Sequence, residues 1–229
     1  MLQGILPYPI LQYIIDHDLA QADRSVKLPP MTELASSMQV SRGKLREDLI
    51  AAEAYGLIEM RPGDGTYVCP FDFYAAIRTL VLYATACDWN NLEHFYHLRV
   101  QIELSFWEEA VSQLTAEDKR ELIDIQERAE HKLAGTPVEI PHQEHRDLHL
   151  LIYRRLENQF VRGLLTTYWD AHEAVGLHHY FDIDHYQNIW HSHRELVSAI
   201  ATGALQDGRR ALARHFDVLR EHLQRPATE

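Results

Sequence analysis

Several features that would place a protein in a special class are missing from this sequence. Its 229 residues include two cysteines, Cys69 and Cys87, which give no disulfide framework and are typical of a reducing cytoplasm. No run of about 18 apolar residues is present, which excludes a membrane-spanning helix. The opening residues, MLQGILPYPI, lack a basic segment and a cleavage site. We therefore expect a cytoplasmic protein with no export signal.

Positive charge is also scarce. Lysine and arginine number 22 against 34 aspartate and glutamate residues, for a formal net charge of −12. A chain this acidic is not a generally basic nucleic-acid binder, so any contact with DNA has to come from a local cluster of cations. The length suits a small domain followed by a larger one.

The first part of the chain carries the signals of three helices and a hairpin. Ser41 is a good N-cap and Gly56 a good C-terminal stop for the third helix, and the loop RPGDG suits a hairpin tip. The apolar spacing and the turn residues predict helices over 9–20, 30–38 and 42–56, and strands over 57–60 and 66–69. This order predicts a winged helix-turn-helix domain over residues 1–69.

Positive charge is concentrated at the start of the third predicted helix. Arg42, Lys44 and Arg46 fall in its first turns, where helices that enter the major groove present side chains to base edges. Ser41 and the free backbone N–H groups at this helix end can hold a phosphate. The alternative is a solvated surface on a winged helix that binds protein.

The segment 28–68, LPPMTELASSMQVSRGKLREDLIAAEAYGLIEMRPGDGTYV, resembles the DNA-binding domain of the GntR family of bacterial transcription regulators. The family pattern is roughly LPSERELA, VSRxxVREAL, LxxxGLV and RxGxGTFV, and the match runs without a gap. The resemblance implies that Arg42 and Arg46 contact DNA and that Gly65 and Thr66 form the wing tip. Gly63 and Gly65 would also let this tip approach a DNA backbone closely.

The match departs from the family pattern in two places. Thr32 stands where the family usually has an arginine, and Gly43 and Lys44 replace the usual threonine and proline or threonine. One expected DNA contact is thereby lost, so the operator sequence is expected to differ from the family's common one.

Residues 70–229 show helical signals only. On the second predicted helix, Leu98, Ile102, Phe106 and Ala110 recur every four residues and are expected to face a core. Amphipathic spacing predicts helices over 72–87, 91–113, 116–134, 139–156, 158–178, 186–202 and 205–224. The fold class is therefore mostly α, with the winged helix followed by an all-α bundle of about seven helices.

Four histidines of this bundle form a candidate metal site. His145 and His149 are four residues apart, so they project from one helix face and can share a metal ion. His193 and His215 lie on two later predicted helices that could face the first. The alternative is that they are surface or satisfied core residues, which is our interpretation for His94, His97, His142, His172, His178, His179, His185 and His191.

Three segments, 98–110, 145–160 and 193–216, resemble the FCD ligand-binding domain of the FadR-type branch of the same family. In many members one aspartate and three histidines bind a divalent metal near the bottom of an effector pocket. The resemblance places these ligands at His145, His149, His193 and His215. Because His145 replaces the aspartate, four neutral nitrogens favour Zn²⁺, or alternatively Ni²⁺, over metals that prefer oxygen.

Arg99 occupies the arginine position of the family's RxxlE pattern. The resemblance implies that it binds the effector's carboxylate, which a guanidinium group can hold with two hydrogen bonds. The alternative is an ion pair with Glu103, four residues along the same helix, on the surface of the domain.

These features predict a metabolite-responsive transcription regulator, specifically a repressor, with no catalytic residues. We expect a homodimer on a near-palindromic operator, with the recognition helices about 34 Å apart. A small carboxylate metabolite is the expected effector. The alternatives are a regulator whose metal is purely structural, or a helical-bundle metalloenzyme, against which the absence of an HExxH motif counts.

Overall fold

The computed structural model describes residues 6–21, 24–176 and 183–220. The chain forms two compact units, residues 1–79 and 80–229, and the division falls inside helix α4 (Phe73–Cys87). The boundary predicted between residues 69 and 70 lies just after the last strand of the first unit. None of the helices in the described ranges has the length and apolar character needed to cross a membrane.

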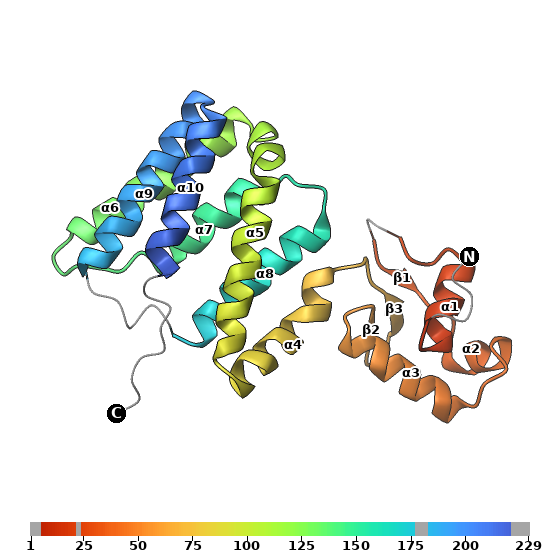
Figure 1. Cartoon of the computed structure of the whole chain (residues 1–229). Coiled ribbons are helices and arrows are strands. Elements are labelled where there is room, and N and C mark those ends of the chain that lie inside the picture. Colours follow the sequence, from red (N-terminus) through yellow and green to blue (C-terminus); the bar gives the residue numbers. More distant parts are fainter. Residues whose placement is uncertain (1–5, 22–23, 177–182, 221–229) are drawn as a thin grey trace. The chain divides into compact units, whose positions relative to one another are not determined.

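The first unit is a winged helix-turn-helix, as predicted (Figure 1). Three strands form one antiparallel sheet in the order β1 (Val26–Lys27), β3 (Gly65–Val68) and β2 (Ile58–Arg61). The sequence missed β1, because two residues are too few to show a periodic pattern. The elements are α1 (Pro9–Asp16), β1 (Val26–Lys27), α2 (Met31–Ser37), α3 (Arg42–Ala54), β2 (Ile58–Arg61) and β3 (Gly65–Val68).

Local signals fix the position of α3. The Ser41 hydroxyl accepts a hydrogen bond from the backbone N–H of Lys44 at 3.1 Å, which confirms the predicted N-cap. The helix ends at Ala54, just before Gly56, whose φ of +70° suits a residue without a Cβ. Leu45 and Leu49 of α3 are fully buried with Ile10 of α1, so the opposite face of α3 is left to solvent.

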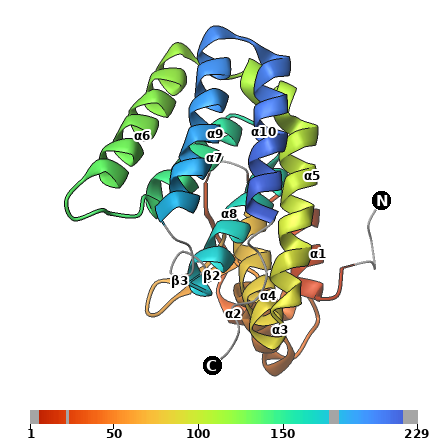
Figure 2. The same ribbon diagram turned by 60° about the vertical axis from the view of Figure 1, so that its left-hand side comes forward.

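The second unit is all α, and with α4 the described ranges of the chain hold seven helices after the wing. Figure 2 shows α6, α9, α10 and α5 side by side, with α7 and α8 against them. Parts of the predicted helices 158–178 and 205–224 lie outside the described residues, as do His178 and His179. The elements are α5 (Asn90–Ser112), α6 (Ala116–Ala134), α7 (His142–Tyr153), α8 (Gln159–Ala174), α9 (Ile183–Thr202) and α10 (Leu205–Arg220).

One expectation about α5 is wrong. Leu98 is 46% exposed, although Ala110 is buried and Ile102 and Phe106 are partly buried against the core. A spacing of four residues drifts by about 40° at each step around a helix of 3.6 residues per turn, so such a row cannot stay on one face. The buried face of α5 instead follows a mixed spacing of three and four, through Leu92, Tyr96, Arg99, Glu103, Trp107 and Ala110.

Candidate functional site

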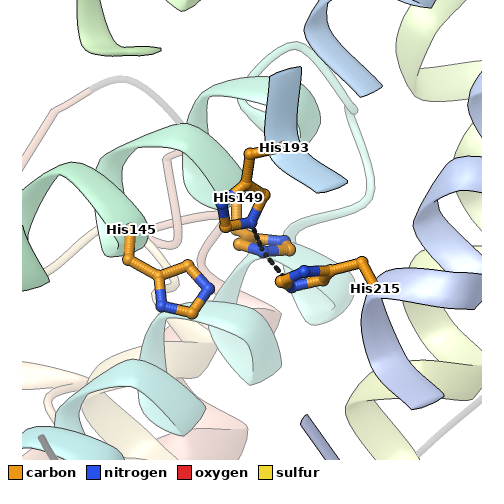
Figure 3. Close-up of side chains that lie close together, drawn as sticks. All are labelled: His145, His149, His193 and His215. Atoms are coloured by element: carbon orange, nitrogen blue, oxygen red, sulfur yellow. Dashed lines mark hydrogen bonds between the residues drawn. The ribbon is translucent and has the colours of Figure 1, made fainter. Parts of the chain in front are cut away.

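The four predicted histidines come together inside the helical domain. His145 and His149 project from α7, His193 from α9 and His215 from α10, and their rings converge on one point (Figure 3). All four are buried, with exposed fractions of 7%, 1%, 0% and 0%. One ring nitrogen from each lies within 4.8 Å of the others. The sequence spacing of the first pair and the bundle topology therefore produce one compact cluster.

Neighbouring side chains fix the tautomers of two of these rings. His149 Nδ1 lies 2.8 Å from Glu103 Oε2, and a carboxylate only accepts, so this nitrogen carries the proton. The Ser192 hydroxyl donates to the carbonyl of Ile189 at 2.7 Å, so it accepts from His215 Nδ1 at 3.0 Å. Both Nε2 atoms are consequently left with lone pairs that point into the cluster.

The Nε2 atoms of three of these rings lie close together. His149 Nε2 lies 3.2 Å from His215 Nε2 and 3.3 Å from His193 Nε2. The unprotonated Nε2 atoms of His149 and His215 cannot hydrogen-bond to each other, so a shared cation is the natural partner for them. Two nitrogens bound to one zinc ion at about 2.0–2.1 Å and a tetrahedral angle would be about 3.3–3.4 Å apart. The spacing of these three rings therefore fits a metal ion.

The remaining ring atoms also lack partners. Neither His145 Nε2 nor His193 Nδ1 has a hydrogen-bond partner among the described residues. Burial holds the pKa of His145 well below its usual range, with a further contribution from the neighbouring histidines, and burial does the same to the pKa of His193. Both imidazoles are therefore neutral near pH 7, as metal ligands have to be.

Arg99 and Glu103 form a buried ion pair beside this cluster. Arg99 Nε donates to Glu103 Oε1 at 2.6 Å, and the two residues are 1% and 0% exposed. The ion pair considered as the alternative for Arg99 thus exists, but inside the domain instead of on its surface. Burial raises the pKa of Glu103, but the charge of Arg99 and the hydrogen bonds from His149 and Arg99 outweigh this, so its pKa is lowered and it stays ionised.

The Arg99 guanidinium group is enclosed by aromatic rings. It lies 4.5 Å from the ring centres of Tyr168 and Trp169 and 5.3 Å from that of Phe216. Its Nη2 atom has no hydrogen-bond partner among the described residues. One strong donor is therefore left over in a buried position next to the histidine cluster.

A pocket of about 300 Å³ reaches the cluster from outside. His145 and Trp169 form part of its wall, and Arg146 and Lys132 bring charge to it. Arg146 pairs with Asp170 at 2.8 Å and Lys132 with Glu144 at 2.7 Å, so both cations of the wall have an acidic partner. The volume is at the lower end of the range for sites that bind small molecules.

The predicted DNA-contacting residues lie together at the start of α3 and at the wing. Ser41, Arg42, Lys44 and Arg46 are exposed. Gly63 and Gly65 have φ values of +77° and +143°, and Thr66 follows in β3. Two further cations lie at the wing: Arg61 of the hairpin, paired with Glu59 at 2.7 Å, and Lys27, which the fold brings there from β1 and which pairs with Asp64 at 3.0 Å.

Each of the two units matches a known protein family. Residues 13–68 match the family of bacterial regulatory proteins of the gntR type, and residues 94–218 match the FCD domain. The two matched ranges contain the α3 cluster and the four histidines, respectively.

The chain belongs to the GntR family, in its FadR-type branch with an FCD domain.

Relatives of this GntR regulator span most of its length. It is 26% identical over 202 residues to the Uxu operon transcriptional regulator of Escherichia coli K12, which covers 86% of this chain and 78% of the relative. It is 24% identical over 196 residues to the HTH-type transcriptional regulator LutR of Bacillus subtilis, covering 83% and 88%. The protein is therefore a DNA-binding transcription regulator and not an enzyme.

Solved structures share the fold of the GntR/FCD chain. Streptococcus agalactiae GntR superimposes with a TM-score of 0.65 at 20% identity, covering 93% of this chain and 95% of that one. The E. coli protein McbR/YncC gives a TM-score of 0.52 at 18% identity, with coverage of 95% and 98%. At these identities the likeness concerns the architecture alone.

The roles of two polar residues of the site could not be predicted from the sequence. Glu103 was considered only as a surface partner of Arg99, and Ser192 was not considered at all. Each touches a histidine that is at least 23 residues away in the chain. No spacing rule connects residues on different helices, so only the fold reveals these contacts.

Proposed function

We propose that this regulator binds one divalent metal ion, Zn²⁺ or alternatively Ni²⁺, through His145, His149, His193 and His215. The observation that carries the proposal is the set of buried Nε2 atoms 3.2–3.3 Å apart, with the tautomers of His149 and His215 set by Glu103 and Ser192. Four neutral nitrogens suit these borderline metals better than Mg²⁺ or Ca²⁺. Polar partners behind the ligands are a usual feature of metal sites in proteins.

The charges around the cluster favour an anionic effector. The carboxylate of Glu103 is already balanced by Arg99, and an imidazole ligand carries no negative charge, so a divalent ion would bring two uncompensated positive charges into the domain. A small carboxylate metabolite would offset part of this charge. When bound, the metal would supply a positively charged coordination position for such an anion.

Two features provide a place for this carboxylate. Arg99 Nη2 is a buried donor without a partner among the described residues, and guanidinium groups match carboxylates well. The pocket at His145 gives access from outside. We therefore propose Arg99 as the effector-binding residue, with Glu103 holding its Nε side in place.

The alternative is a purely structural metal. If all four histidines bind at once, a tetrahedral ion has no open position and the site would only hold α7, α9 and α10 together. The pocket that reaches His145 favours an accessible site, because a ligand could displace or join this outermost histidine.

On the DNA side, we propose that a homodimer binds a near-palindromic operator as a repressor. Each protomer would place the start of α3 in a major groove and its wing on the backbone. The exposure of these residues and the positive φ values at the wing support this arrangement. The proposed contacts are Ser41, Arg42, Lys44, Arg46, Gly63, Gly65 and Thr66.

Thermal unfolding of the zinc-loaded full chain tests the effector proposal. A panel of small carboxylic acids is added, each paired with its uncharged amide as a matched control. At a concentration about 100 times its Kd, a ligand that binds only the folded state adds about 2.7 kcal/mol of stability. We expect at least one acid, but not its amide, to raise the Tm of the wild type and to leave that of His149→Ala unchanged. Flat responses from every acid would support the structural metal instead.

A further inference from the structure

A buried carboxylate lies under the DNA-facing end of α3. Asp48 is 1% exposed and sits on the inner face of the helix with Leu45, Leu49 and Ala52. Lys44 Nζ lies 2.8 Å from Asp48 Oδ1, and no other described residue hydrogen-bonds or forms an ion pair with this carboxylate. Since an unpaired buried charge is strongly unfavourable, Asp48 requires the ammonium group of Lys44.

Lys44 is bent toward its own helix by this contact. It stands one turn before Asp48 and is half exposed, so its chain can reach inward while part of it stays in water. The hydrogen bond to Asp48 raises the pKa of Lys44, so the lysine remains charged near pH 7. Its charge is already engaged before any DNA arrives.

The two arginines beside it are in a different situation. Arg42 and Arg46 are exposed, and no ion pair or side-chain hydrogen bond involves either of them within the described part of the chain. The cluster at the start of α3 thus contains two free guanidinium groups and one ammonium group that is held by a carboxylate.

We propose that Asp48 withholds Lys44 from the DNA phosphates, which removes Lys44 from the set of contacts proposed above, and so lowers the affinity of the regulator for DNA of arbitrary sequence. Binding to arbitrary duplex DNA comes almost entirely from cations that neutralise phosphates. Removing one cation from that interaction weakens it, while Arg42 and Arg46 stay available for base edges. Asp48 is thereby a positioning residue that favours specific over non-specific binding.

The salt dependence of DNA binding tests this inference. Fluorescence anisotropy with a labelled duplex of mixed sequence gives the slope of log K against log salt concentration, between about 50 and 200 mM. The full chain is compared as wild type, Asp48→Ala, Lys44→Ala and the double variant. Glu47→Ala is the matched control, because it removes the same charge from an exposed neighbouring position without an ion pair.

If Asp48 restrains Lys44, Asp48→Ala should bind the duplex several-fold more tightly, and its slope should steepen by about 0.9 for each protomer in contact with DNA. Lys44→Ala should hardly change the slope of the wild type but should abolish the gain of Asp48→Ala. Glu47→Ala should give a smaller gain in affinity and leave the slope unchanged.

Two results would overturn the inference. One is that Lys44→Ala reduces the salt slope equally in the wild type and in the Asp48→Ala background. This would mean that Lys44 reaches a phosphate in the wild type. The other is an equal gain from Glu47→Ala and Asp48→Ala, which would reduce the effect to net charge. Far-UV circular dichroism checks that each variant is folded, and Asp48→Asn, which keeps the shape of the side chain, replaces Asp48→Ala if that variant is not.

Discussion

The two units of the chain place arginine in opposite surroundings. In the winged helix, Arg42 and Arg46 are exposed and have no ion-pair partner within the described ranges. In the helical domain, Arg99 is 1% exposed, paired with Glu103 and enclosed by three aromatic rings. The first arrangement leaves cations free for a large anionic partner, and the second fixes a single cation next to the histidine cluster.

This difference shows how an acidic protein can have a DNA-binding end. The free arginines form a local cluster at one helix start, and the net charge of −12 does not prevent that. In the helical domain, by contrast, the polar groups of the site hold one another in place, from Arg99 through Glu103 to His149. Such a chain of contacts restricts the site to one geometry, which metal binding needs.

Removing one histidine from the buried cluster should change the protein's properties most. His149→Ala should lower zinc affinity by more than about 100-fold, beyond the range seen when a residue behind a ligand is changed. Competition with a chromophoric chelator measures it. His94→Ala, which alters an exposed histidine of α5, is the matched control and should bind zinc as the wild type does. Equal losses from both variants would contradict the four-histidine site.

The second effect concerns the pH dependence of the metal-free protein. His145 and His193 have lowered pKa values in the folded state because they are buried, whereas unfolded histidine titrates near about 6.5. Below that pH the unfolded chain binds more protons, so the free energy of unfolding should fall with decreasing pH, by up to about 1.4 kcal/mol per pH unit for each histidine.

Urea unfolding between about pH 5 and 7 measures this effect, above the range in which unfolded carboxylates titrate. His193→Phe should reduce the slope, since one of the buried imidazoles with a lowered pKa is gone. A stability that stays constant over this range would show that the buried histidines are not held neutral.

The third effect concerns Glu103, the carboxylate between Arg99 and His149. Glu103→Gln keeps an acceptor for His149 Nδ1 but removes the charge that balances Arg99. Zinc affinity should fall by about 10- to 100-fold, as is usual for residues behind a metal ligand. The d–d absorption spectrum of the cobalt-loaded variant should also change, which a loss of stability alone would not cause. An unaltered affinity and spectrum would leave Glu103 without a role in the site.

The smallest effect tests the exposed arginines. Arg46→Ala should weaken DNA binding by about 1–3 kcal/mol if Arg46 contacts a base edge, because such contacts typically have this strength. Gel-shift titration against an operator fragment measures the change. Zinc affinity should not change, which separates the two units. A variant that binds DNA as well as the wild type would move the recognition surface away from the start of α3.

Much of the fold could be predicted because its signals are local. The N-cap at Ser41, the apolar spacing and the glycines of the wing are signals that act within a few residues, so they can be read from the sequence. The structure confirms the winged helix and the helical bundle that they predicted. The prediction for Leu98 was wrong because the buried face of α5 is partly charged. It contains Arg99 and Glu103, whereas the prediction considered apolar residues alone.

The candidate site was predictable only in part. The spacing of His145 and His149 lies within one helix, but their meeting with His193 and His215 depends on how α7, α9 and α10 pack. The roles of Glu103 and Ser192 depend on contacts between helices as well. The carboxylate beneath Lys44 escaped attention because the sequence does not show which face of α3 is buried.

The metal content of the full chain, purified without chelators or a polyhistidine tag, is the most direct test. Elemental mass spectrometry should find about one zinc or nickel ion per chain, because the four histidines form a single site. No metal in the purified protein, and none after incubation with zinc or nickel, would contradict the metal centre on which the proposed function rests.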